Sequence, residues 1–143
     1  MAKEEATKVF LHKFRLGLSL SIGLLSGMTG ASIPNITIFA AGIANATALG
    51  VYSAFQQMTH KRSVIITFIA STVGALLPVS SYAFMKTNAA LVASMALTVF
   101  LLFAASSTSL ENKTFKDGIK NIGMTFLIAI LTFIVGILIR PML

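Results

Sequence analysis

Five long apolar runs, separated by short polar or basic connections, divide the chain. An α-helix needs roughly 20 predominantly apolar residues to cross the hydrocarbon core of a bilayer, and each run reaches or approaches that length. The connections are a turn at 34–35, a basic group at 60–62, a turn at 86–88 and a polar link at 111–120. The pattern predicts membrane-spanning helices over residues 16–33, 36–58, 64–85, 89–107 and 122–139.

The segment before the first run, residues 1–15, mixes charged and apolar side chains. Its Lys, Arg and Glu residues alternate with Val9, Phe10, Leu11 and Phe14, which predicts a short amphipathic lead-in on the cytoplasmic membrane surface. A secretory signal also joins basic residues to an apolar core, but this basic region is long and four more apolar runs follow. We therefore expect an uncleaved first span and a single five-helix domain over 16–143.

Composition excludes a soluble domain. Of the 143 residues, 56% are hydrophobic and only 10% are charged, whereas a soluble domain carries about a quarter charged residues. The acidic side chains all lie outside the apolar runs, at Glu4, Glu5, Glu111 and Asp117. The absence of cysteine excludes disulfides, thiolate metal sites and cysteine nucleophiles. The expected fold class is all-α, an integral membrane bundle of five helices.

The distribution of Lys and Arg predicts the orientation of the helices, because cytoplasmic connections of membrane proteins carry an excess of these residues. With a cytoplasmic N-terminus, the outer segments hold only Lys86 and Arg140. The inner segments hold Lys3, Lys8, Lys13, Arg15, Lys61, Arg62, Lys113, Lys116 and Lys120. We therefore expect a multi-pass protein of the cell membrane with the N-terminus inside and the C-terminus outside. The placement of the basic residues at the ends of the apolar runs also explains the net charge of +7. We therefore expect lipid, and not nucleic acid, as the partner.

Small residues recur at intervals of four in the first two predicted helices. Lipid tails are as apolar as leucine, so spanning helices associate through close backbone contact at small residues. The stripes that predict such contacts are Gly23, Gly27 and Ala31 in the first helix and Gly42, Ala46 and Gly50 in the second. Both a contact within the chain and a seam between two copies fit this pattern. The fifth run, rich in Leu, Ile, Val and Phe, is expected to face lipid.

Pro78 lies inside the third predicted helix. Because proline has no backbone N–H, it cannot donate to the carbonyl one turn earlier, at Gly74, and it disturbs that turn. The hydroxyls of Ser80 and Ser81 are placed to bond freed carbonyls nearby. We therefore expect a kink at Pro78.

Three segments resemble the vacuolar iron transporter family in their sequences and in their order along the chain. They are the run SGMTGA at 26–31, the run AGIA at 41–44 and the run GALLPVSSY at 74–82. The last is similar to the family's Gly-Ala-Leu-Ile-Pro-Leu-Leu-Pro-Tyr stretch, with Ser81 in place of the second proline. The resemblance extends over nearly all of 16–139. It implies five spans, a cytoplasmic N-terminus, a homodimer and transport of iron or manganese out of the cytoplasm.

The departures from that family fall on the positions that the resemblance assigns to the transport path. Leu16 stands where the family carries Asp, Asn45 where it carries Glu, and Ser53 where it carries Met. The pair Gln56 and Gln57 replaces a Gly-Glu pair, and the metal-collecting insert is reduced to residues 59–63. Every ionisable position of the family's path is therefore neutral or apolar in this chain.

The remaining residues supply no substitute for those ligands. A hard divalent cation needs anionic oxygen ligands, and proton coupling needs a titratable group within a span, but no Asp, Glu or His lies inside an apolar run. Met28, Met95 and Met124 are more simply explained as apolar filling, and His12 and His60 as interface residues. Without a nucleophile–base pair, phosphate loop or metal motif, we expect neither an enzyme nor a bound cofactor.

Three functions remain open. The favoured hypothesis is an accessory or structural subunit of a multi-chain membrane complex, such as a membrane-bound oxidase or monooxygenase, with other membrane subunits or a second copy as partners. The first alternative, a divalent metal transporter, rests on the family resemblance alone. The second is a carrier of a small neutral molecule along the polar face that contains Asn45, Ser53, Gln56 and Gln57. Interhelical hydrogen bonding is the simpler explanation of that face.

Overall fold

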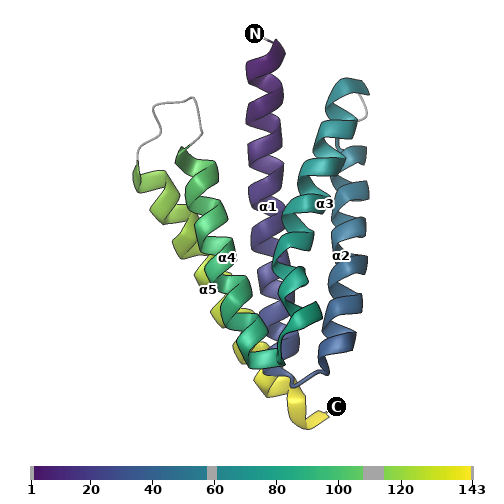
Figure 1. Cartoon of the computed structure of the whole chain (residues 1–143), viewed down its shortest axis with the longest axis vertical. Coiled ribbons are helices and arrows are strands. Elements are labelled where there is room, and N and C mark those ends of the chain that lie inside the picture. Colours follow the sequence, from purple (N-terminus) through teal and green to yellow (C-terminus); the bar gives the residue numbers. More distant parts are fainter. Residues whose placement is uncertain (1, 58–60, 108–114, 143) are drawn as a thin grey trace.

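The computed structural model describes residues 2–57, 61–107 and 115–142, and all regular elements in these ranges are helices. The elements are α1 (Ala2–Gly30), α2 (Asn35–Phe55), α3 (Lys61–Phe84), α4 (Thr87–Ser107), α5 (Phe115–Ile139) and the short 3-10 helix η1 (Arg140–Met142). Successive helices run in opposite directions, so the two termini lie at opposite ends of the bundle (Figure 1). These elements confirm the predicted all-α fold. Each of the five α-helices is long and apolar enough to span a membrane, as predicted.

Several helices begin or end at residues other than the predicted ones. The predicted lead-in does not form a separate element, because α1 continues from Ala2 through the span in one direction (Figure 1). Two signals end α1 before the predicted residue 33: Ser32 has a positive φ of 59°, and Pro34 precedes the first residue of α2. At the other end of the chain, α5 begins at Phe115 and not at 122. Of the predicted connections at 60–62 and 111–120, residues 60 and 111–114 lie outside the described residues, whereas 61–62 belong to α3 and 115–120 to α5.

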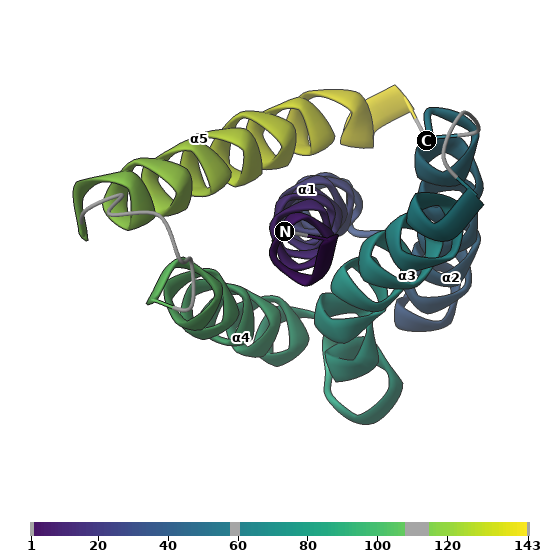
Figure 2. The same cartoon turned by 90° about the horizontal axis from the view of Figure 1, so that it is seen from above.

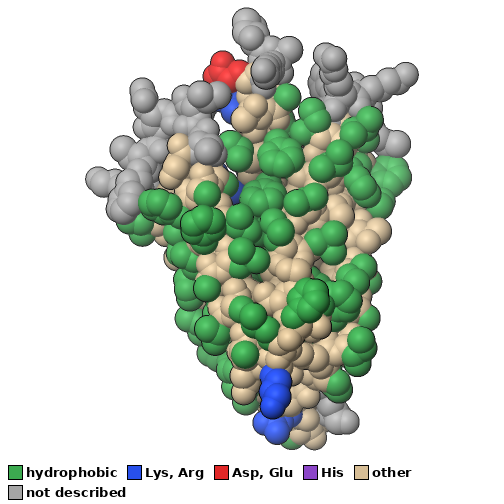
Figure 3. Space-filling model, viewed as in Figure 1, with side chains coloured by type: hydrophobic (Ala, Val, Ile, Leu, Met, Phe, Trp, Pro, Cys, Tyr) green, Lys and Arg blue, Asp and Glu red, His purple; other side chains and the backbone are tan. Residues whose placement is uncertain are grey.

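The first helix is the centre of the bundle. Seen from above, α1 is surrounded by the other four, with α2 and α3 on one side and α4 and α5 on the other (Figure 2). Its side chains at Leu18, Ile22 and Leu25 are fully buried. Over the face shown in Figure 3, hydrophobic side chains cover the middle of the molecule, and the charged side chains that are described lie near its ends. An apolar flank with charges at the ends is the surface that a bilayer requires.

The small stripe of α1 packs on α5. A Cβ on Gly136 of α5 would overlap the carbonyl oxygen of Gly27 and lie 2.9 Å from the nitrogen of Ala31. A Cβ on Gly23 would lie 2.8 Å from Cγ2 of Ile128. The two backbones can approach this closely only because these positions carry no side chain or a very small one. The helix expected to face lipid, α5, is mostly exposed and packs on α1 along this narrow seam.

The small stripe of α2 packs on α3. A Cβ on Gly42 would lie 2.6 Å from Cγ2 of Val79, and one on Gly50 would overlap the hydroxyl of Thr72. Ala46 between them is fully buried. The two stripes predicted from the sequence therefore serve two different contacts within the chain, one with α5 and one with α3.

Pro78 is buried within α3, which remains one α-helix to Phe84. The Ser80 hydroxyl donates to the carbonyl of Leu77 at 2.7 Å, not to the carbonyl of Gly74 that proline leaves without its usual donor. Ser80 therefore adds a local bond on the C-terminal side of Pro78.

A cluster of buried apolar residues lies at the end of the bundle away from the N-terminus. It is formed by Leu25, Ile38, Val79, Tyr82 and Ala90, near the turns that join α1 to α2 and α3 to α4. Toward the N-terminal end, α4 and α5 lean away from α1 (Figure 1). The helices therefore converge at one end of the bundle and diverge at the other, which we call the open end.

Hydroxyl pairs add hydrogen bonds between α1 and α5. The oxygens of Ser26 and Thr132 are 2.7 Å apart, as are those of Ser19 and Thr125. We expect Ser26→Ala to lower the free energy of unfolding by about 0.6 kcal/mol, the average for an interhelical hydrogen bond in membranes. Thermal unfolding in mild detergent, followed by circular dichroism, measures the loss. Ser80→Ala is the control, because its hydroxyl bonds within its own helix; an equal loss in both variants would contradict the assignment.

Candidate functional site

Two cations lie on the central helix at the open end of the bundle. Lys13 is only 8% exposed, and its Nζ donates to Oε1 of Gln56 at 2.8 Å, just beyond the last residue of α2. Arg15 is half-buried, and its Nη2 donates to the backbone carbonyl of Ala105 in α4. Residues two positions apart point about 200° away from each other around a helix. The two cations therefore reach to opposite sides of α1.

Neither cation has a carboxylate partner among the side chains that the structure describes. The described acidic residues are Glu4 and Glu5, which are exposed, and Glu4 pairs with Lys8 at 3.4 Å. With a rise of about 1.5 Å per residue, Glu5 lies about 12 Å before Lys13 along α1. Lys13 and Arg15 are thus held by neutral acceptors. The ε nitrogen of Arg15 is buried and has no hydrogen-bond partner.

A cavity of about 210 Å³ opens beside Arg15, between α1, α4 and α5. Its polar lining comes from His12, Arg15, Ser19, Asn121 and Thr125, and no acidic side chain lines it among the residues whose side chains the structure describes. The Ser19 and Thr125 hydroxyls face each other within it at 2.7 Å. The cavity is therefore a site of positive potential with several neutral hydrogen-bonding groups, which favours an anion and disfavours a metal cation.

The predicted path residues are divided between this cavity and the helix α2. Leu16 lines the cavity and is 37% exposed, whereas Ser53 is buried on the face of α2 that packs on α3. Gln56 accepts the bond from Lys13, and Gln57 follows it. Asn45 is half-buried, with its amide nitrogen inside and without a partner. Over the described ranges, no three His, Cys, Asp or Glu side chains form a group able to hold a metal ion.

A second set of polar groups lies deeper in the bundle. The hydroxyls of Ser21, Ser53, Thr67 and Ser71, from α1, α2 and α3, are buried without a hydrogen-bond partner within the chain. Serine and threonine are small enough to be tolerated at close helix contacts in membranes. Their dispersal over three helices gives a weakly polar interior in which these hydroxyls lie apart from any acidic side chain that the structure describes.

The sequence interpretation treated Lys13 and Arg15 only as charges that set orientation. The sequence alone does not predict the contacts that these two side chains make, although it contains one indication that Lys13 is buried. Lys13 shares a helix face with Gly17 and Ser21 at intervals of four, and a Cβ on Gly17 would lie 2.5 Å from the backbone oxygen of Ser71 in α3. A lysine in line with such small residues belongs to a face that packs against other helices.

Comparisons with family models, with characterised proteins and with solved structures find no match to this chain. The resemblance to vacuolar iron transporters therefore remains a prediction from three short motifs. The chain has five helices long and apolar enough for a multi-pass membrane protein. The buried Lys13 and the half-buried Arg15 lie in the N-terminal half of α1, and the polar cavity lies beside Arg15.

Proposed function

We propose that the chain is a non-catalytic accessory subunit of a multi-chain membrane complex, built on a bundle like that of the vacuolar iron transporters and lacking their metal path. The observation that carries the proposal is the ammonium group of Lys13, buried and bonded to Gln56. Gln56 is one of the positions that the resemblance assigns to the path. A fixed positive charge there repels a divalent cation, so the site opposes the chemistry that a metal transporter needs.

The surface of α2 also supports a partner in the membrane. Ala40, Ala44 and Ala48 form a second row of small residues, and all three are exposed. Small residues allow the close backbone approach on which helix association in lipid depends. A neighbouring helix from another subunit has room to pack there, with the N-terminus of this chain in the cytoplasm as the positive-inside rule predicts.

The test of the proposal is extraction from the native membrane in mild detergent, native-gel sizing and mass spectrometry of the chains that migrate together. We expect other membrane chains in fixed stoichiometry with this one. The matched control is an unrelated multi-pass protein from the same extract, which separates specific partners from shared micelles. Migration as a lone monomer or homodimer would contradict the subunit proposal.

Iron flux into liposomes separates the subunit from the transporter. We expect no flux above that of protein-free liposomes from the unmodified chain, and we expect Leu16→Asp together with Asn45→Glu to be necessary before any flux appears. The control is Leu16→Asn with Asn45→Gln, which adds polarity without charge. Saturable flux by the unmodified chain would overturn the proposal and favour the transporter.

A further inference from the structure

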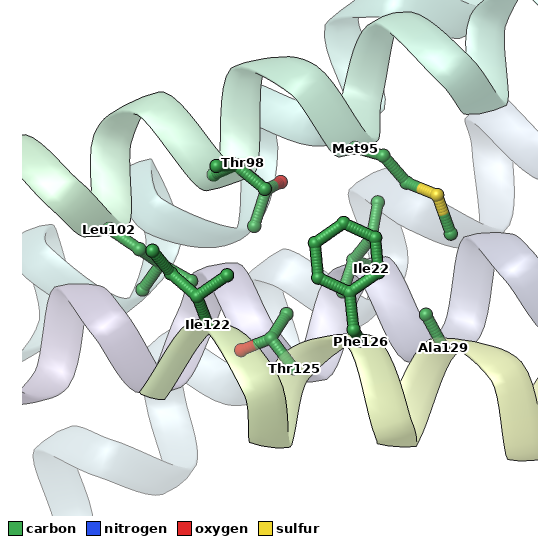
Figure 4. Close-up of a pocket in the computed structure, with 9 residues that line it drawn as sticks. Ile22, Met95, Thr98, Leu102, Ile122, Thr125, Phe126 and Ala129 are labelled. Atoms are coloured by element: carbon green, nitrogen blue, oxygen red, sulfur yellow. The ribbon is translucent and has the colours of Figure 1, made fainter. Parts of the chain in front are cut away.

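The polar cavity beside Arg15 adjoins an apolar track along α4 and α5. The cavity shares Leu102 and Thr125 with a narrow slot between α1, α4 and α5, shown in Figure 4. The slot in turn shares Met95, Val99 and Phe126 with an outer groove whose lining side chains are all apolar. Because the slot holds only about 10 Å³ of free space, an acyl chain does not fit inside it and would have to cross the side chains that line it to reach the groove. The cavity and the groove share no lining residue and are linked through the residues of the slot, so cationic and hydrogen-bonding groups lie on one side of the slot and apolar groups on the other.

The charge of Arg15 is not compensated by the chain as the structure describes it. Its guanidinium has one backbone carbonyl as acceptor, and its buried ε nitrogen has none. A guanidinium within a spanning bundle is costly unless it is paired or reaches the interface. Arginine offers a planar fork of donors that matches two oxygens of a phosphate. His12, Asn121 and Ser19 line the same cavity and supply further donors for such oxygens.

The depth of Arg15 suits a lipid headgroup. Arg15 precedes the last residue of α1, Gly30, by 15 positions, which is about 22 Å of helix at 1.5 Å per residue. The hydrocarbon core of a bilayer is about 30 Å thick. The Arg15 backbone thus lies near one edge of the hydrocarbon layer, within reach of a headgroup at the interface. Basic pockets between spanning helices are known binding sites for acidic headgroups.

We propose that this site binds an anionic phospholipid, with its phosphate at Arg15 and an acyl chain in the groove formed by Val92, Met95, Val99, Phe103 and Phe126. The apolar groove favours a lipid over free phosphate, because only a lipid fills both ends of the site. This inference goes beyond the accessory role and does not depend on it, since a transporter with the same cavity would bind the same lipid.

The test is native mass spectrometry of the purified chain with equal amounts of phosphatidylglycerol and phosphatidylcholine. We expect one phosphatidylglycerol to be retained in preference to phosphatidylcholine, and Arg15→Gln to reduce that preference by about tenfold, the loss that corresponds to one charged hydrogen-bonding group. Lys13→Gln is the matched control, because it removes one charge from the same helix on the side away from the cavity. The proposal is overturned if the two variants lose the preference equally or if the unmodified chain shows none.

A second measurement distinguishes the lipid from a free anion. We expect phosphatidylglycerol to raise the thermal unfolding temperature of the unmodified chain, and millimolar inorganic phosphate to leave it unchanged. An equal rise with inorganic phosphate would overturn the lipid assignment. Arg15→Lys is a second variant that keeps the proposal testable if Arg15→Gln does not fold. It keeps the charge but not the fork, so we expect an intermediate preference, and an unchanged preference would exclude the phosphate contact proposed for the guanidinium.

Discussion

Gly136→Ala is expected to lower the free energy of unfolding by about 3 kcal/mol, at the upper end of the range for overpacked sites. The new methyl group would overlap the carbonyl oxygen of Gly27 and lie 3.0 Å from its carbonyl carbon and 2.9 Å from the nitrogen of Ala31. These are backbone atoms, which cannot rotate aside as a side chain can. The seam between α1 and α5 must therefore open along its length.

The control for this prediction is Gly123→Ala in the same helix. A Cβ on Gly123 meets nothing within 4 Å, and alanine favours a helix over glycine by about 1 kcal/mol. We expect Gly123→Ala to be neutral or slightly stabilising in thermal unfolding followed by circular dichroism in detergent. Comparable destabilisation by both substitutions would show that glycine itself, and not the α1–α5 contact, is what these positions require.

Gln56→Lys is expected to lower the free energy of unfolding by about 2 kcal/mol. It would place a second ammonium beside Lys13, whose Nζ now lies 2.8 Å from Oε1 of Gln56. Two like charges about 4 Å apart repel by about 4 kcal/mol at the effective dielectric constant near a protein surface. The expected cost is about half of that, because Gln56 is exposed and water screens its side chain.

Two further variants test whether the loss of stability in Gln56→Lys comes from charge repulsion. Gln56→Glu offers Lys13 a carboxylate and should raise the unfolding temperature, whereas a purely steric effect would make glutamate and lysine similar. The exchange Lys13→Gln with Gln56→Lys restores one charge and one neutral amide, and should recover most of the stability lost in Gln56→Lys. Failure of the exchange to recover stability would mean that the two side chains are not energetically coupled.

The Lys13–Gln56 pair also bears on the proposed function. Residues far apart in the sequence meet there, with a cation from α1 and an amide from the end of α2. The proposal gives two separate reasons against metal transport, the positive charge of Lys13 and the missing carboxylates at Leu16 and Asn45. Removal of Lys13 alone is therefore expected to restore no metal binding.

The sequence alone determined the membrane-spanning architecture. Apolar runs of about 20 residues predict five helices because an unpaired backbone is too costly in lipid for other structures. The prolines and small residues also marked where chain turns and close contacts occur, as at Pro34 and Gly42. These are local properties, set by each segment's composition and length, and they do not depend on which helices become neighbours.

Only the tertiary structure decided which helices meet and what each polar residue faces. Gly27 and Gly42 looked alike in sequence, yet one contacts α5 and the other α3. Lys13 and Arg15 looked like two orientation charges, yet one bonds an amide on α2 and the other borders a cavity. Which helices become neighbours depends on how four helices cross around α1, and helices of similar apolar surface carry little information about that order. The site is a property of this arrangement, because no single segment contains it.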